Sequence, residues 1–122
     1  MGDFRRLRVW REAKRLAVLS RDAIRMLPQT ELYALGAQWR RAAYSVSLNI
    51  AEGAGQPSRR QFARYLNIAL GSVDELQGIF EFVGEMGYVG DPQLAELRTC
   101  RTHCARLLIA LIRSLDASSG NA

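Results

Sequence analysis

Two cysteines and the sole histidine lie within five residues of one another, and they are the side chains best suited to metal or redox chemistry. Cys100, His103 and Cys104 have the spacing i, i+3, i+4, which on a helix gives three zinc-type ligands on one side. A fourth ligand is missing, and Cys104 falls at an apolar position, where free cysteine is a common small core residue. With one histidine, a Ser-His-Asp or Cys-His arrangement also has little support. We therefore expect no metal, no cofactor, no catalytic residue and no enzymatic activity.

Arginine is the second feature with chemical potential, because 16 of the 17 basic residues are Arg. Residues 1–64 hold 13 basic and 5 acidic side chains, whereas residues 65–122 hold 4 and 7. Such a basic half favours an anionic partner such as RNA or DNA, whose phosphates Arg can contact without reading the base sequence. The alternative is a solvated face with salt bridges, since acidic residues lie nearby. The candidate phosphate-binding residues are Arg5, Arg8, Arg11, Arg15, Arg59, Arg60 and Arg64.

Three turn signals divide the chain into segments that each carry an apolar repeat at helical spacing. Pro28 lies in the first signal, a Gly-rich run with Pro57 forms the second, and Gly87 to Pro92 forms the third. Ser58 and Gln61 have the spacing of a capping box. The pattern predicts helices over about residues 6–27, 31–52, 58–86 and 92–115. Short loops between long helices make an all-α, antiparallel up-down-up-down four-helix bundle over residues 1–116, with a disordered tail at 117–122.

Glycines within these segments have two predicted roles. Gly53 suits a left-handed cap at the end of the second helix. Gly71, Gly78 and Gly84 in the third helix support close packing, because glycine is costly inside a helix. Gly71 and Gly78 are seven residues apart, so they share a face that a partner backbone could approach closely.

The second predicted helix is apolar on two opposite sides. One side is the bundle seam around Trp39, and the other is a stripe formed by Ala37, Tyr44, Leu48 and Ala51. A surface helix of a monomeric bundle needs only one apolar side, so the stripe predicts contact with another subunit. The alternative is that the N-terminal arm, with Phe4, folds over it.

A line of polar residues runs between the two apolar sides at spacings of three and four. These side chains touch on a helix and can form a hydrogen-bonded network with partners from the third helix. We interpret the network as structural, fixing helix register and subunit pairing. Its members are Gln38, Arg41, Ser45, Asn49 and Glu52, with Ser72 and Glu75 as partners.

No apolar run approaches the roughly 20 residues that span a bilayer, and the charged N-terminus lacks the apolar centre of a signal peptide. The sequence therefore predicts a cytoplasmic protein without membrane contact.

Three stretches resemble a bacterial four-helix bundle family first described from intervening sequences in 23S ribosomal RNA genes. They are Phe4–Trp10 (FRRLRVW), Gln38–Gly53 (QWRRAAYSVSLNIAEG) and Phe62–Leu76 (FARYLNIALGSVDEL). The resemblance implies a bundle assembled into a homo-oligomeric ring, a pentamer. It also implies kinship with the accessory protein of diversity-generating retroelements, which binds nucleic acid and a reverse transcriptase. Tyr44 departs from the family, which usually has a smaller or aliphatic residue there.

Together these features predict a non-enzymatic, oligomeric binding module that engages RNA or DNA through its basic face. The alternative is a protein–protein scaffold or adaptor with no nucleic-acid role, in which the arginines serve solubility and subunit salt bridges.

Overall fold

The computed structural model describes residues 2–120, which over that range form only helices and turns. A single 3-10 turn, η1, precedes the first long helix, and a π-helical turn, η2, joins α2 to α3 without a break. The elements are η1 (Phe4–Arg6), α1 (Arg8–Ile24), α2 (Gln29–Glu31), η2 (Leu32–Gly36), α3 (Ala37–Ala54), α4 (Arg59–Glu85) and α5 (Asp91–Gly120).

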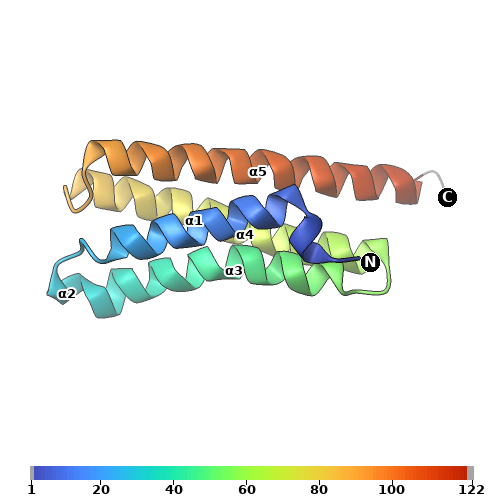
Figure 1. Cartoon of the computed structure of the whole chain (residues 1–122), viewed down its shortest axis with the longest axis horizontal. Coiled ribbons are helices and arrows are strands. Elements are labelled where there is room, and N and C mark those ends of the chain that lie inside the picture. Colours follow the sequence, from blue (N-terminus) through green and yellow to red (C-terminus); the bar gives the residue numbers. More distant parts are fainter. Residues whose placement is uncertain (1, 121–122) are drawn as a thin grey trace.

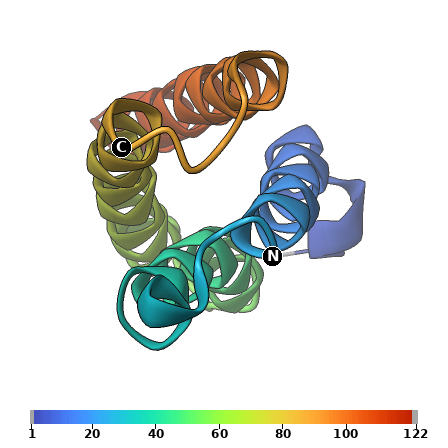
Figure 2. The same cartoon turned by 90° about the vertical axis from the view of Figure 1, so that its left-hand side faces the viewer.

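The long helices α1, α3, α4 and α5 run antiparallel to their chain neighbours and pack around a common axis (Figure 1). Seen end-on, they occupy four corners, with α3 between α1 and α4 and α5 closing the circuit (Figure 2). The predicted up-down-up-down four-helix bundle is confirmed. Because the direction alternates, α1 and α4 both begin at the end of the bundle where α3 and α5 finish. None of the described helices is both long and apolar enough to cross a membrane.

Helix boundaries follow the predicted turn signals. The Ser58 hydroxyl accepts the Gln61 backbone N–H at 3.2 Å, so the capping box starts α4 as predicted. At the other end of α4, Gly87 adopts φ +68°, a left-handed conformation that glycine enters at little cost. The Tyr88 backbone N–H then reaches back to the Val83 carbonyl at 3.0 Å and closes the helix.

Two boundaries differ from the prediction. The first helix ends at Ile24, because residues 26 and 27 bond to carbonyls only three positions back, a tighter turn that leads into Pro28. The tail was predicted to be disordered from residue 117, yet α5 continues to Gly120. The sequence has neither Pro nor Gly from Ala117 to Ser119, so no helix-breaking residue ends α5 there. Residues 121 and 122 lie outside the described part of the chain.

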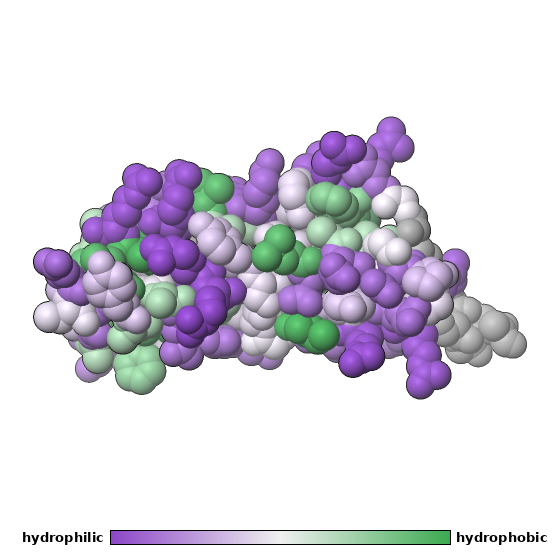
Figure 3. All heavy atoms as spheres, turned by 90° about the horizontal axis from the view of Figure 1, so that it is seen from below, coloured by the Kyte–Doolittle hydropathy of each residue, from purple (hydrophilic) through white to green (hydrophobic). Residues whose placement is uncertain are grey.

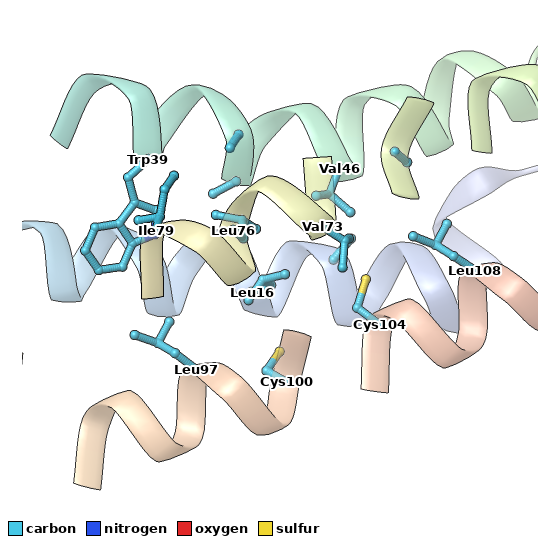
Figure 4. Close-up of a cluster of buried hydrophobic side chains, with 14 of the residues drawn as sticks. Leu16, Trp39, Val46, Val73, Leu76, Ile79, Leu97, Cys100, Cys104 and Leu108 are labelled. Atoms are coloured by element: carbon cyan, nitrogen blue, oxygen red, sulfur yellow. The ribbon is translucent and has the colours of Figure 1, made fainter. Parts of the chain in front are cut away.

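The core fills the space between the four long helices with fully buried side chains from each of them (Figure 4). Trp39 and Phe80 pack edge to face with ring centroids 5.7 Å apart. Ser20 is also fully buried, and neither its hydroxyl nor the Trp39 indole N–H has a hydrogen-bond partner among the described residues. The aliphatic residues around the ring include Leu16, Val46, Val73, Leu76, Leu97 and Leu108.

Close helix packing depends on Gly53 and on Gly84, the latter being one of the three glycines predicted to support it. A Cβ on Gly53 would lie 2.8 Å from Tyr65 Cβ, and one on Gly84 would lie 2.9 Å from a Leu94 methyl. Gly71 and Gly78 are exposed, and a Cβ on either would meet no atom within 4 Å, so the predicted close approach at these two is wrong within this bundle. The predicted left-handed cap at Gly53 is wrong as well, since α3 continues through it to Ala54.

Candidate functional site

The two predicted arginine clusters lie at the same end of the bundle. Arg59, Arg60 and Arg64 occupy the first two turns of α4, while Arg8 and Arg11 begin α1, and all five are exposed. The arm brings Arg5 to this end too, because Phe4 and Leu7 line a small cavity of about 60 Å³ with Ala54 and Phe62. The structure thus gathers residues that are more than 40 positions apart in the sequence.

Four of the five exposed arginines, Arg8, Arg11, Arg59 and Arg60, lie in the first turn of a helix, where acidic side chains are normally found. The N-terminus of a helix has the equivalent of about half a positive charge, which acidic residues in the first turn usually offset. Neither α1 nor α4 has an acidic residue in its first turn. Arginine there adds positive charge to positive charge, an arrangement that disfavours the isolated protein and favours a bound anion.

Ion pairing separates the seven candidate arginines into two groups. Arg5 contacts Asp3 at 2.9 Å, and its hydrogen bonds lower the pKa of that carboxyl. Arg15 lies 3.4 Å from Glu12 and 3.5 Å from Glu96. Among the described residues, no ion pair forms at the other five, which are Arg8, Arg11, Arg59, Arg60 and Arg64.

Charge is segregated along the length of the bundle. We divide each helix near its middle and call residues 2–15, 46–71 and 105–120 the basic end; residues 16–45 and 72–104 are the acidic end. The basic end holds 11 basic and 4 acidic side chains, and the acidic end holds 6 and 8. The net charge of +5 therefore resolves into +7 at one end and −2 at the other. Such a distribution attracts a polyanion to one end of the molecule.

The predicted apolar stripe on α3 faces outward. Leu48 is 65% exposed and Tyr44 is 42% exposed, while Ala37 and Ala51 are half-buried. Ile68 on α4 adds a further exposed side chain, 45% accessible. On the side of the molecule where α3 lies, hydrophobic patches sit among hydrophilic side chains (Figure 3). A surface of this kind is typical of a contact with another protein.

The N-terminal arm does not cover this stripe. Phe4 packs edge to face on Trp10, with centroids 5.1 Å apart, and lies beside Ala54 and Phe62 at the basic end. The alternative interpretation of the stripe, as a seat for the arm, is therefore wrong.

Five of the seven residues in the predicted network, which comprises the polar line and its two partners on α4, are joined by hydrogen bonds in two separate groups. The Ser72 hydroxyl donates to Ser45 Oγ at 2.8 Å, and the Asn49 amide donates to the Ser45 carbonyl and hydroxyl at 2.8 and 2.9 Å. Gln38 donates to Glu75 at 3.1 Å. Both groups include a bond between α3 and α4, and so link the two helices.

The last two members of the line, Arg41 and Glu52, are exposed. Within residues 2–120, the side chain of neither makes a hydrogen bond or an ion pair. They are thus outside the network in the single chain, where water solvates them.

Cys100 and His103 meet an acidic side chain that the sequence analysis did not single out. Glu12 on α1 accepts from the Cys100 thiol at 3.2 Å, and His103 Nδ1 lies 3.4 Å from the same oxygen. Cys104 instead points into the core beside Leu108 and Val73 (Figure 4). The three side chains with zinc-ligand spacing do not converge, and the described residues contain no group of three that could hold a metal ion.

The pKa values of this cluster follow from its burial. Burial, and then the hydrogen bond to Glu12, raises the pKa of the Cys100 thiol to about 12. Burial alone would raise the pKa of Glu12, but hydrogen bonds from Cys100 and His103 and the nearby Arg15 charge outweigh it and lower the pKa. The cluster thus holds an ionised carboxylate and a neutral thiol, which bond α1 to α5 and leave no activated sulfur nucleophile.

Comparison with known proteins identifies the group to which this bundle belongs. The family model of the 23S rRNA-intervening sequence protein matches residues 5–110. The chain belongs to that family. A crystal structure of a protein of unknown function from the S23 ribosomal protein family of Bacteroides thetaiotaomicron is 25% identical, covering 86% of this chain and 95% of the other with a TM-score of 0.79. No curated protein sequence matches. The predicted family is confirmed; the kinship with retroelement accessory proteins stays a prediction.

In this member of the 23S rRNA-intervening sequence protein family, the structure shows what three residues contribute in the run Asn49-Ile50-Ala51-Glu52-Gly53. Asn49 bonds Ser45 within the network, Ile50 is fully buried in the core, and Gly53 permits contact between α3 and α4. Ala51 and Glu52 lie on the outer side of the helix instead, where their contacts within the chain are few.

Proposed function

We propose that the protein is a non-enzymatic, homo-oligomeric binding module whose basic end engages the phosphate backbone of RNA or DNA. The observation that carries this proposal is the group of five exposed, unpaired arginines, four of which lie in the first turn of helices that have no acidic residue there. Each would gain a charge-assisted hydrogen bond with phosphate, and the helix N-termini would add to the attraction. Binding would not depend on the nucleotide sequence of the RNA or DNA.

The salt dependence of binding gives the quantitative test. If all five arginines contact duplex phosphates, the slope of log K against log salt is about −4.5. A labelled RNA duplex titrated at 50 and 200 mM salt should then lose affinity by roughly 500-fold per subunit engaged. Absence of binding, or binding that salt leaves unchanged, refutes the electrostatic proposal.

A matched pair of variants locates the site. Arg59→Gln with Arg60→Gln should reduce the slope by about two, because two phosphate contacts are lost. Arg25→Gln with Arg40→Gln removes the same charge from exposed positions at the acidic end and should leave the slope nearly unchanged. Equal weakening by both pairs would mean that net charge, not the basic end, determines binding.

The homo-oligomer is proposed from the exposed stripe on α3. Burying Leu48 on association would contribute about 1–2 kcal/mol per contact, since roughly a third of its surface is already covered. Leu48→Asp should therefore reduce the mass measured by light scattering while circular dichroism shows unchanged helix content. Ala95→Asp, at an exposed position on α5, is the control. A mass of one 13.7 kDa subunit for the unaltered protein at high concentration would refute assembly.

A ring of five subunits in the cytoplasm is the form that the family resemblance supports, and a reverse transcriptase is the protein partner that the retroelement kinship suggests. The exposed stripe also supports the second candidate, a protein scaffold with no nucleic-acid role. Charge reversal at Arg8, Arg11, Arg59 and Arg60 separates the two. Intact assembly with lost RNA binding favours the module, whereas lost assembly favours the scaffold.

A further inference from the structure

Two shallow hollows on different helices have an apolar centre and oppositely charged rims. The first lies between α1 and α3, has a volume of about 240 Å³ and is continuous with the exposed stripe through Tyr44. Val18, 42% exposed, lies in its apolar centre, and Lys14 and Arg21 form its rim. We call it the basic groove. Its lining residues are Lys14, Ala17, Val18, Arg21, Tyr44 and Ser47.

The second hollow lies on the C-terminal half of α4 and has a volume of about 410 Å³. Phe82 stands in it with 58% of its surface exposed, and Glu81 and Glu85 flank the ring. Gly78, one turn before Phe82, leaves open space beside it, since a Cβ there would meet nothing within 4 Å. We call these four residues the Phe82 patch.

The charges around each hollow oppose its pairing with itself. Two basic grooves placed face to face would bring Lys14 and Arg21 of both copies together. Two Phe82 patches would oppose Glu81 and Glu85 in the same way. Like charges across an interface are unfavourable, whereas a groove placed against a patch unites opposite charges and buries the Phe82 ring against apolar side chains.

The charged rim residues make contacts within the chain that are weak enough for contacts with a second subunit to replace them. Arg21 pairs with its chain neighbour Asp22, and Lys14 lies 5.2 Å from the centre of the Trp10 ring. Glu81 lies 3.6 Å from Arg98, with both side chains well exposed. Exposed pairs of this type contribute little, so an interface that excludes water can replace them.

We propose that the Phe82 patch of one copy docks in the basic groove of the next, so that subunits associate through two different surfaces. This inference rests on the proposed homo-oligomer and specifies which faces meet. A contact between unlike surfaces is head-to-tail, and it builds a closed ring when the rotation between neighbours allows closure. A two-fold dimer in which two basic grooves or two Phe82 patches face each other is the arrangement that it excludes.

Cysteine cross-linking tests the pairing directly. Val18→Cys and Phe82→Cys place thiols at exposed positions, whereas the native Cys100 and Cys104 are buried and should not react with the cross-linker. An affinity-tagged Val18→Cys chain mixed with an untagged Phe82→Cys chain should form mixed cross-linked dimers with a short bismaleimide. The Val18→Cys chain alone should form few cross-linked dimers. Ile109→Cys, on α5, is the control and should not cross-link to Phe82→Cys.

Cross-linking of Val18→Cys to itself, or equal cross-linking of Ile109→Cys, would overturn the proposed pairing. Charge exchange gives an independent readout by light scattering. Lys14→Glu with Arg21→Glu, or Glu81→Lys with Glu85→Lys, should weaken association by at least tenfold, and all four together should restore it. Assembly that none of these variants alters overturns the pairing but leaves the oligomer intact. A monomeric unaltered protein overturns both.

Discussion

Gly53 offers a sharp test of how α3 and α4 pack at the basic end. Gly53→Ala adds one methyl group whose carbon would lie 2.8 Å from Tyr65 Cβ, 3.0 Å from the Phe62 ring and 3.2 Å from the Phe62 carbonyl oxygen. Two of these neighbours, the carbonyl and the Cβ, belong to the α4 backbone or are fixed to it. A side-chain rotation cannot move them, so the two helices must separate.

The net effect combines two opposing terms. Carbon atoms pack best at about 3.5–4.0 Å, so the helices must move apart by close to 1 Å at this point. Overpacking of this kind costs about 1–3 kcal/mol, and rigid neighbours favour the upper part of that range. Alanine is preferred over glycine inside a helix by about 1 kcal/mol, which offsets part of the strain. We expect Gly53→Ala to destabilise the protein by about 1–2 kcal/mol.

Gly71→Ala is the matched control, because it makes the same chemical change within α4 where no atom lies within 4 Å. It should stabilise the protein by about 0.5–1 kcal/mol through helix propensity alone. The two variants should therefore differ by about 1.5–3 kcal/mol in urea denaturation followed by circular dichroism, or by about 10 °C in Tm. Measurement at two protein concentrations removes any contribution from assembly. Equal stabilities of the two variants would refute the packing described for Gly53.

Three further outcomes are expected. Ser20→Ala should stabilise the protein by about 1–2 kcal/mol in the same denaturation assay, because it removes a buried hydroxyl without a partner and because alanine favours the helix. Destabilisation by this substitution would mean that the hydroxyl is hydrogen-bonded. The stability advantage of the protein over Glu12→Gln should disappear as pH falls below about 4.5, since the pKa of Glu12 is lowered in the folded state and its ionised form is lost only in acid. Cys100 and Cys104, whose pKa values are both raised to about 12, should resist alkylation by iodoacetamide at pH 8 until denaturant is added, and rapid reaction in the native protein would contradict their burial.

The fold could be predicted from sequence because its determinants are local. Capping by Ser58 and the turn at Gly87 act within a few residues, and the apolar repeat in each helix repeats at helical spacing. The Ser45–Asn49 contact was foreseeable for the same reason, since residues four apart on a helix touch.

Features that depend on contacts distant in sequence could not be predicted in the same way. In the sequence, Gly53 resembles a glycine that caps a helix. Only the position of Tyr65 shows that it is needed for close contact between α3 and α4. Glu12 meets Cys100, 88 residues away, and no local spacing links the two. The outward direction of the α3 stripe was predictable from its helical angle, whereas only the structure shows that the N-terminal arm lies elsewhere.

The segregation of charge along the bundle gives the molecule a large electric dipole parallel to its long axis. In any assembly whose subunits point the same way, the positive poles crowd onto one rim and repel each other. A polyanion that spans neighbouring subunits would relieve that repulsion, so assembly and polyanion binding would strengthen each other by the same factor. Salt would weaken the binding of the polyanion and would also screen the repulsion between the positive poles.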